Sequence, residues 1–145
     1  MEFKEKSDYA YKLEDMCYSC IYFLLNKGEV CYVGQSNRGM IRALTHYKDK
    51  EYDEVRVIVV NEELLDEKEA FYILKYTPKY NFSLPYYISI KSIKQKLKTN
   101  YNIRVRIDKI QKYIKANIKN YYYYNSGIYI SPEDFEKCME YFIKN

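Results

Sequence analysis

Short runs of apolar residues in the first half of the chain predict β-strands. Two runs, 20–25 and 30–33, are rich in β-branched and aromatic residues, and residues 26–29 between them have the composition of a hairpin turn. A third run, 55–60, is too apolar for a strand exposed on both faces. The pattern therefore predicts a β-hairpin followed by a third strand.

Two helices are predicted around the third strand. Residues 34–37 offer a bend and capping candidates for a helix over about 38–48. Residues 61–63 open a second helix that runs to about Tyr76, because Thr77 precedes a proline and is driven out of the helical region. The predicted order is strand, strand, helix, strand, helix.

The pattern after Pro85 predicts two further helices. Residues 89–98 and 105–117 each repeat isoleucine or leucine at helical spacing, and a turn-like stretch, 99–102, joins them. This arrangement is typical of a helix-turn-helix.

A hairpin and a final helix complete the pattern. Two tyrosine-rich or isoleucine-rich runs, 121–124 and 128–130, flank a turn over residues 125–127. Ser131 is placed to cap a helix that has Pro132 at its first position. With the two preceding helices, these elements resemble a winged helix-turn-helix. One face of the last helix is formed by Phe135, Cys138, Met139 and Phe142.

Composition fits a globular protein. Of 145 residues, 48% are hydrophobic and 30% are charged, which suffices for a packed core. We expect no membrane partner, because the sequence has neither a long uncharged apolar run nor the apolar stretch of a signal peptide at its start. The four cysteines are too few for a disulfide scaffold and are expected to be free thiols. These features favour the cytoplasm, or the nucleus if the source is eukaryotic or viral.

Positive charge is concentrated in the second half. Residues 79–120 contain nine lysines and two arginines against the single acid Asp108, a net charge of +10, which leaves −6 elsewhere because the total is +4. Such asymmetry indicates a polyanion-binding part, although a genome that favours Lys, Asn, Ile and Tyr codons explains some of the lysines. The candidate DNA-binding residues are Lys91, Lys94, Arg104, Arg106, Lys109, Lys112 and Lys115.

Glu69 is not explained by the amphipathic pattern of its helix. Helical spacing places it within an apolar stripe that includes Leu65, Tyr72, Ile73 and Tyr76. A buried carboxylate needs a partner, which can be a cationic side chain across a helix contact, hydrogen-bond donors or a metal ion. The sequence leaves these alternatives open.

Arg42 and His46 form a second unexplained pair. They lie four residues apart, on the face opposite Met40, Leu44 and Tyr47 of the predicted helix, and His46 is the only histidine in the chain. A solvated helix face would explain this pair as well as a site would.

The joint spacing of seven positions within residues 20–81 is more specific than any one of them. They are Cys20-Ile-Tyr22, Tyr32-Val-Gly34, Arg42, His46, Glu69, Pro78 and Asn81. Together with the order of elements, they resemble the GIY-YIG nuclease domain. That domain occurs in the incision subunit of bacterial nucleotide-excision repair, in some homing and restriction endonucleases and in small stand-alone nucleases.

Two positions depart from the family pattern without removing a functional side chain. Cys20 stands where the family has glycine, and Val33 stands where it has isoleucine. Residues Gly127-Ile-Tyr129 also resemble the first signature of the family, but we do not assign them to it, because no Tyr-x-Gly, arginine or glutamate follows at the spacing that the family pattern requires.

The resemblance implies an α+β fold and a division of the chain. A lead-in segment, 1–19, precedes a GIY-YIG-like domain over 20–83, in which helices flank a three-stranded antiparallel sheet. A small, mainly helical and basic DNA-binding module follows over 84–145, with the boundary near residues 81–85.

The resemblance also implies roles in metal-dependent endonucleolytic cleavage of DNA, which we expect to be double-stranded. Tyr22 would be the general base, with Tyr32 hydrogen-bonded nearby, and Arg42 and His46 would contact the phosphate. Glu69 would be the single protein ligand of Mg²⁺ or Mn²⁺. The end of the last helix of the domain would be oriented near that metal by Asn81.

Three alternatives remain open at this stage. The chain could keep the fold as a catalytically inert DNA-binding protein, or its basic half could bind RNA. Cys17 and Cys20 have half the spacing of a zinc site, but Cys31 and Cys138 supply no second pair. The sequence predicts neither the target site, nor nicking as against double-strand cleavage, nor the biological role, nor the oligomeric state.

Overall fold

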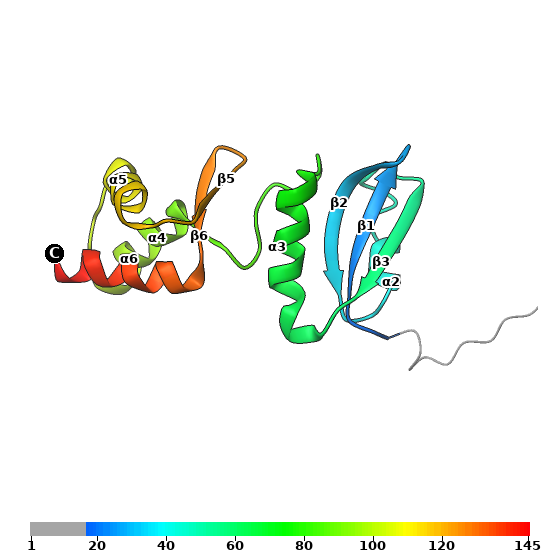
Figure 1. Cartoon of the computed structure of the whole chain (residues 1–145), viewed down its shortest axis with the longest axis horizontal. Helices are drawn as coiled ribbons and strands as arrows, with labels where there is room; N and C mark the ends of the chain where they lie inside the picture. The colour runs from blue at the N-terminus through cyan, green and yellow to red at the C-terminus, as the bar shows by residue number, and fades with distance from the viewer. Residues whose placement is uncertain (1–16) are drawn as a thin grey trace, which may run out of the picture. The chain divides into compact units, whose positions relative to one another are not determined.

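The computed structural model describes residues 17–145, which form two units (Figure 1). The first unit runs to Glu69 and also contains Pro78–Tyr80, and the second contains Ala70–Thr77 and Asn81–Asn145. Most of the predicted lead-in segment, residues 1–16, lies outside the described residues. Within residues 17–145 no helix is long and apolar enough to cross a membrane.

The first unit is built on a three-stranded antiparallel sheet, as the sequence predicts. Its strands are β1 (Cys20–Asn26), β2 (Glu29–Ser36) and β3 (Glu54–Val59). Figure 1 shows them side by side in the order β2-β1-β3. The predicted hairpin turn is confirmed, and Gly28 adopts a φ of +82°, which glycine tolerates without strain. The second strand is longer than its predicted apolar run and continues to Ser36.

β1 is the central strand and is buried on both faces. On one face Tyr22 and Leu24 pack with Cys31 of β2 and with Ala43. β3 is an edge strand, and only Val55 and Val57 pack against this cluster. Its last residue, Val59, is 71% exposed. The strand is therefore covered on one face only, which agrees with the prediction for its apolar run.

The helix predicted over 38–48 is much shorter in the structure. α2 spans only Ile41–Leu44, after which the chain continues in turns. The hydroxyl of Thr45 donates to the carbonyl of Arg42 at 2.7 Å, and the backbone N–H of His46 bonds to the carbonyl of Ala43, three residues back instead of four. These bonds compete with the α-helical pattern.

The apolar residues of this segment do not cover the core. Met40, Leu44 and Tyr47 are exposed, whereas the small side chain of Ala43 is fully buried. His46 is half-buried. Of the pair Arg42 and His46, it is therefore His46 that lies inward, while Arg42 is exposed.

The second predicted helix is confirmed, with a tighter first turn. A 3₁₀ turn, η1 (Glu62–Leu64), leads into α3 (Leu65–Tyr76). Thr77 adopts a φ of +43°, so the residue before Pro78 does leave the right-handed helical region and the helix ends there. The division between the two units falls within α3.

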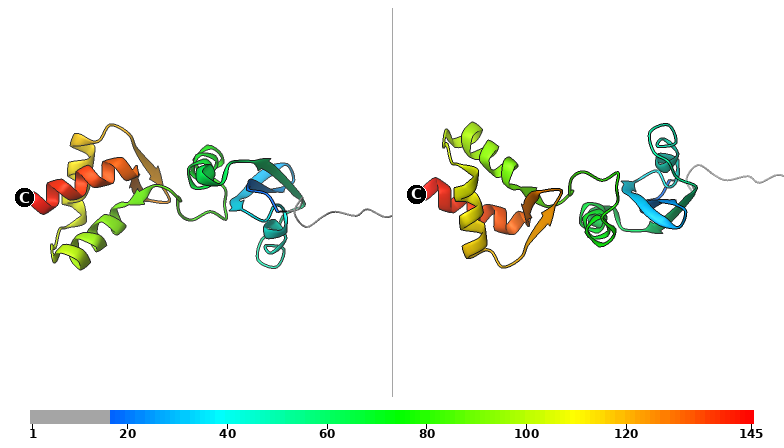
Figure 2. Two further views of the ribbon diagram at one scale, coloured as in Figure 1. Left: turned by 90° about the horizontal axis from the view of Figure 1, so that it is seen from below. Right: turned by 90° about the horizontal axis from the view of Figure 1, so that it is seen from above.

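The elements predicted for the second half are also present, and a short strand is added to them. They are β4 (Ile88–Ser89), α4 (Ile90–Tyr101), α5 (Ile107–Asn117), β5 (Tyr121–Tyr124), β6 (Gly127–Ile130) and α6 (Pro132–Lys144). β4 was not predicted, and it pairs with β6 to give a sheet of order β4-β6-β5. In both views of Figure 2 the three helices lie together, with the hairpin of β5 and β6 beside them.

Local sequence explains how these helices begin and end. The Ser131 hydroxyl accepts a hydrogen bond from the N–H of Asp134 at 3.1 Å, which confirms the predicted cap of α6. α4 continues through most of the predicted turn and ends where Asn102 adopts a left-handed conformation, with a φ of +54°.

The second unit has its own apolar core. The predicted apolar face of α6 belongs to this core, although Phe142 is only partly buried. The isoleucines and leucine that repeat at helical spacing in α4 and α5 also belong to it, except Ile107, which is exposed. Its fully buried members are Ile93, Leu97, Ile110, Ile114, Ile130 and Cys138. The winged helix-turn-helix description of this unit stays a prediction.

Candidate active site

Tyr22 lies at the centre of the sheet, with 1% of its surface exposed. Its partner across the β1–β2 pair is Gly34. A Cβ atom at position 34 would lie 2.4 Å from the Cζ and Oη atoms of Tyr22, so the phenol ring needs a glycine there. The Tyr-x-Gly part of the sequence pattern thus has a steric reason.

Two other predicted residues, Tyr32 and His46, lie beside this ring. A hydrogen bond of 2.8 Å joins Tyr22 Oη and His46 Nε2. The ring of Tyr32 lies 6.1 Å from that of Tyr22 and 4.7 Å from that of His46, measured between centroids. The turn after α2 therefore brings the only histidine against two tyrosines from adjacent strands.

Burial and nearby charges shift the pKa values of this cluster. Burial raises the pKa of Tyr22 well above its ordinary range, Tyr32 adds to the rise, and Arg42 opposes it. Burial and then Lys50 lower the pKa of His46, Asp49 opposes them, and Arg42 makes the smallest contribution, which also lowers it. At neutral pH, Tyr22 is therefore a phenol and His46 is an uncharged imidazole.

Lys50 belongs to this cluster, although the sequence analysis did not select it. Its Nζ atom donates to His46 Nδ1 at 3.1 Å and lies 4.7 Å from the centre of the Tyr32 ring. The spacing of four residues from His46 was a signal, but it is weak in a chain with 24 lysines and arginines.

Glu69 is buried, as its position in the apolar stripe of α3 predicts, with 9% of its surface exposed. Within residues 17–145, no lysine or arginine forms an ion pair with it. Its Oε2 atom accepts a hydrogen bond of 2.7 Å from the amide of Gln35, which also bonds to Asp66. Of the alternatives left open by the sequence, the structure thus shows a hydrogen-bond donor and not a cationic side chain.

The pKa of Glu69 reflects this environment. Burial raises it to about 7, the Gln35 hydrogen bond acts in the opposite direction, and Asp66 raises it further. Gln35 and Asp66 were missed by the sequence analysis, because their proximity depends on how β2 and α3 approach each other.

The donor set around Glu69 suits a hard divalent cation. Glu69 and Asp66 offer carboxylate oxygens, which Mg²⁺ and Mn²⁺ prefer, whereas Gln35 turns its amide N–H groups to both carboxylates. Among residues 17–145, no group of three or more His, Cys, Asp or Glu side chains is placed to hold a metal ion. Carboxylate oxygens suit a cation such as Mg²⁺, which keeps several of its waters.

The four cysteines are free thiols, as predicted.

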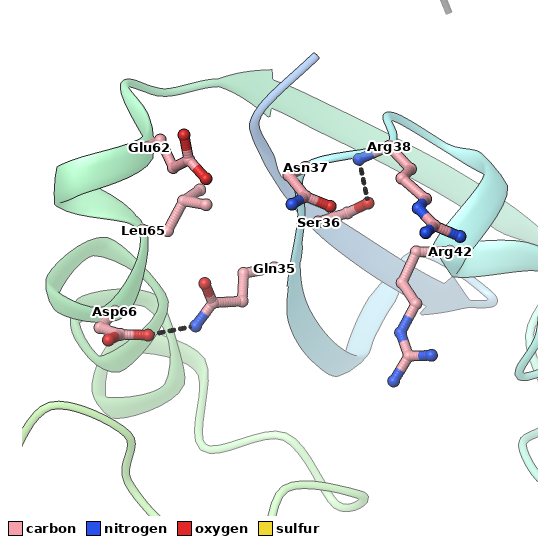
Figure 3. Close-up of a pocket in the computed structure, with 8 residues that line it drawn as sticks. All are labelled: Gln35, Ser36, Asn37, Arg38, Arg42, Glu62, Leu65 and Asp66. Atoms are coloured by element: carbon pink, nitrogen blue, oxygen red, sulfur yellow. Dashed lines mark hydrogen bonds between the residues drawn. The ribbon is translucent and has the colours of Figure 1, made fainter. Parts of the chain in front are cut away.

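A cleft of about 480 Å³ lies beside Gln35 and Asp66 (Figure 3). The guanidinium groups of Arg38 and Arg42 lie on one side, and the carboxylates of Glu62 and Asp66 lie on the other. Arg42 is exposed and forms no ion pair with the described residues, so its fork is free to bind an anion. The cleft therefore has positively charged groups on one side and negatively charged groups on the other.

Asn81 belongs to the second unit and is buried. Its carbonyl oxygen accepts hydrogen bonds from Tyr124 Oη at 2.6 Å and from the side-chain amide of Asn125 at 3.2 Å. The expected role of Asn81 near the metal stays a prediction.

The predicted DNA-binding residues are all exposed. Two clefts, of about 440 and 410 Å³, adjoin the segment Ile103–Arg106 between α4 and α5. Only Arg106 among the predicted residues forms an ion pair within the described part of the chain, with Asp108 at 3.0 Å. The basic residues that line these clefts are Lys94, Lys98, Arg104, Arg106 and Lys109. Lys91, Lys112 and Lys115 line neither cleft.

The chain is similar to crystal structures of the GIY-YIG N-terminal endonuclease domain of UvrC from Thermotoga maritima. The domain bound to its catalytic cation, magnesium, is 35% identical over 44% of this chain and 83% of that one, with a TM-score of 0.38. A variant with a tyrosine replaced by phenylalanine is 32% identical over 46% and 84%, with a TM-score of 0.39. No protein-family model and no curated protein matches the chain.

The assignment of the chain to a family rests on its 35% sequence identity over 83% of that domain, and not on the TM-score. The three-stranded antiparallel sheet agrees with it. The chain therefore belongs to the GIY-YIG nuclease family, through a domain that accounts for just under half of its length.

Proposed function

We propose that this protein is a metal-dependent DNA endonuclease that hydrolyses phosphodiester bonds. The observation that carries the proposal is the buried carboxylate of Glu69, which has no cationic partner among residues 17–145 and is joined through Gln35 to a cleft that contains Arg42. The same unit holds the hydrogen-bonded pair of Tyr22 and His46.

Phosphodiester hydrolysis needs an activated water, stabilisation of the charge on the phosphoryl oxygens and help for the leaving oxygen. Mg²⁺ or Mn²⁺, when bound, would supply charge neutralisation and a more acidic water. Glu69 would be its protein ligand, and Asp66, which shares the Gln35 amide with Glu69, would add negative charge nearby. Arg42 would hold a non-bridging phosphate oxygen through its guanidinium fork.

Tyr22 is our candidate for the general base. Its pKa is raised in the described state, so its oxygen must be stabilised as an anion before it can accept a proton from water. Two groups support such an anion: Arg42, whose charge lowers the pKa of Tyr22, and His46, which is within hydrogen-bond distance of Oη.

We propose that the second unit supplies most of the affinity for DNA, which we take to be double-stranded. Lys94, Lys98, Arg104 and Lys109 line clefts beside Ile103–Arg106 and form no ion pair within the described residues. Unpaired, exposed cations of this kind bind phosphates and release counterions. A boundary at residues 81–85, between a domain over 20–83 and a module over 84–145, remains part of this proposal.

Cleavage of supercoiled plasmid tests the proposal directly. We expect nicked or linear products with Mg²⁺ or Mn²⁺ and none with EDTA. Glu69→Gln, prepared in parallel, should bind DNA without cleaving it. If the parent protein binds DNA but never cleaves it with either metal, the alternative of a catalytically inert DNA-binding protein replaces the proposal.

A further inference from the structure

His46 has a polar partner on each ring nitrogen. Nε2 lies 2.8 Å from Tyr22 Oη, and Nδ1 lies 3.1 Å from Lys50 Nζ. A phenol can donate or accept a hydrogen bond, but an ammonium group can only donate. The contact with Lys50 therefore decides the direction of both bonds.

Because Lys50 donates to Nδ1, this nitrogen must be an acceptor and carry no proton. The uncharged imidazole then has its proton on Nε2, so the Tyr22 oxygen accepts the hydrogen bond from His46. We propose that Lys50 is a positioning residue, which holds His46 in the Nε2–H tautomer so that His46 donates to Tyr22 and does not accept the Tyr22 proton. The tautomer stands independently, whereas its effect on cleavage rests on the proposed function.

Lys50 is well held for such a role. Its side chain is 12% exposed, and Nζ also donates to Asp49 Oδ2 at 3.0 Å. The ammonium group lies over the Tyr32 ring, and the centre of the Tyr80 ring is 6.0 Å away. Little side-chain freedom therefore remains to weaken its contact with His46.

Among residues 17–145, Asp49 is the neighbour that would favour the other tautomer. Its Oδ1 atom lies 3.8 Å from His46 Nδ1, which is too long for a hydrogen bond, whereas Lys50 is at 3.1 Å. The other charged or titratable groups that face His46 are Tyr22, Tyr32 and Arg42. Without the Lys50 ammonium group, Asp49 would be free to draw the proton to Nδ1.

The chemical consequence concerns the Tyr22 oxygen. An N–H donor aimed at this atom stabilises its anionic form more than its neutral form. With the proton fixed on Nε2, His46 offers no lone pair to the phenol, so a proton relay from Tyr22 to His46 is excluded. The phenol proton must leave by another route.

The single histidine makes the tautomer directly measurable. Full-length protein labelled with ¹⁵N-histidine gives one pair of ring nitrogens in long-range ¹H–¹⁵N correlation spectra at neutral pH, without metal or DNA. We expect a protonated, pyrrole-type Nε2 and an unprotonated, pyridine-type Nδ1. A proton on Nδ1 in the parent protein would overturn the proposal, whatever the variants do.

Three variants separate the role of Lys50 from a merely structural one. Lys50→Met should shift the proton towards Nδ1, and Lys50→Arg, which can also only donate, should retain Nε2–H. Lys48→Met is the matched control, because Lys48 lies over Tyr47 and makes no contact with His46 in the described structure. An unchanged tautomer in folded Lys50→Met would contradict the proposal, and if that variant does not fold, the parent and Lys50→Arg spectra still decide it.

Turnover tests the catalytic consequence. Lys50→Met should lower the rate of plasmid cleavage at saturating protein on the order of tenfold or more, with unchanged DNA affinity, and Lys50→Arg should recover most of it. A changed tautomer with unchanged turnover would overturn the positioning role. If the parent protein does not cleave DNA at all, the proposed function fails while the tautomer measurement stands.

Discussion

The phenol ring of Tyr22 occupies the space that any side chain at position 34 would need. The two residues face each other in the β1–β2 pair, and a Cβ on Gly34 would lie 2.4 Å from Tyr22 Cζ. Gly34 is therefore required by close packing, and not by a left-handed backbone. Within the family pattern, Gly34 thus leaves the space that the Tyr22 ring occupies.

Replacing Gly34 by alanine should expel the Tyr22 ring from its place. We expect Gly34→Ala to lose roughly 1–3 kcal/mol of stability, or more, and to lose cleavage, because overpacking in a buried sheet forces a backbone or rotamer shift. Chemical denaturation and plasmid cleavage measure the two effects. In a Tyr22→Leu background the same change should cost much less stability, and simple additivity of the two substitutions would contradict the steric explanation.

Glu69→Gln should abolish metal-dependent cleavage and keep DNA binding. Glutamine has almost the same shape and can still bond to Gln35, but it lacks the charge that a divalent cation needs. Plasmid cleavage with Mg²⁺ and anisotropy with labelled duplex DNA give the two readouts. Cleavage equal to that of the parent would remove Glu69 from the site.

Glu69 should also make stability depend on pH. Burial raises its pKa to about 7 from an ordinary value near 4.5, so the folded state holds this proton more tightly than the unfolded state does. The resulting stability is complete below the unfolded pKa and is lost as the pH rises through the folded pKa, a loss of about 3 kcal/mol.

The difference between the parent and Glu69→Gln isolates this contribution. In EDTA, the free energy of unfolding of the parent should fall relative to that of the variant as the pH rises from about 5 to about 8. At the higher pH, added Mg²⁺ should raise the stability of the parent and leave that of the variant unchanged. Denaturant titrations at each pH measure this. A constant difference across the range would mean that Glu69 is not buried as an unpaired carboxylate.

The two tyrosines should differ in their effects on turnover. Tyr22→Phe deletes only an oxygen, so we expect a large fall in turnover with little loss of DNA affinity, as for a group that acts in the transition state. Single-turnover cleavage and anisotropy distinguish these effects. If Tyr22→Phe is as active as the parent while Tyr32→Phe is inactive, the roles of the two residues are exchanged.

The basic clefts of the second unit should carry the salt dependence of DNA binding. Replacing Lys94, Lys98 and Arg104 by glutamine should flatten the slope of log affinity against log salt by roughly two to three units. A parallel variant with Lys109, Lys112 and Lys115 replaced should show how far the face of α5 shares this role.

Lys137 and Lys144 provide the control for this experiment. Both lie on α6 and form ion pairs with acidic residues of the same helix. Their replacement by glutamine should leave the salt slope unchanged. An equal loss of slope in this control would mean that net charge, and not the clefts, determines the affinity.

The sequence by itself determined most elements and the identity of the candidate residues. Apolar alternation, the hairpin turn at Gly28 and the stop at Thr77 are local features, and each predicted element exists. The seven-position spacing selected Tyr22, Tyr32, His46 and Glu69 before any geometry was known. Local rules failed at α2, where bonds from Thr45 and His46 shorten the predicted helix.

Only the tertiary structure decided which groups meet. Tyr22 meets His46 across 24 positions of the chain, and Gln35 meets Glu69 across 34 positions. The direction of the hydrogen bond between Tyr22 and His46 then follows from a third side chain. Such contacts depend on how distant segments approach one another, which neither hydrophobic periodicity nor residue spacing encodes.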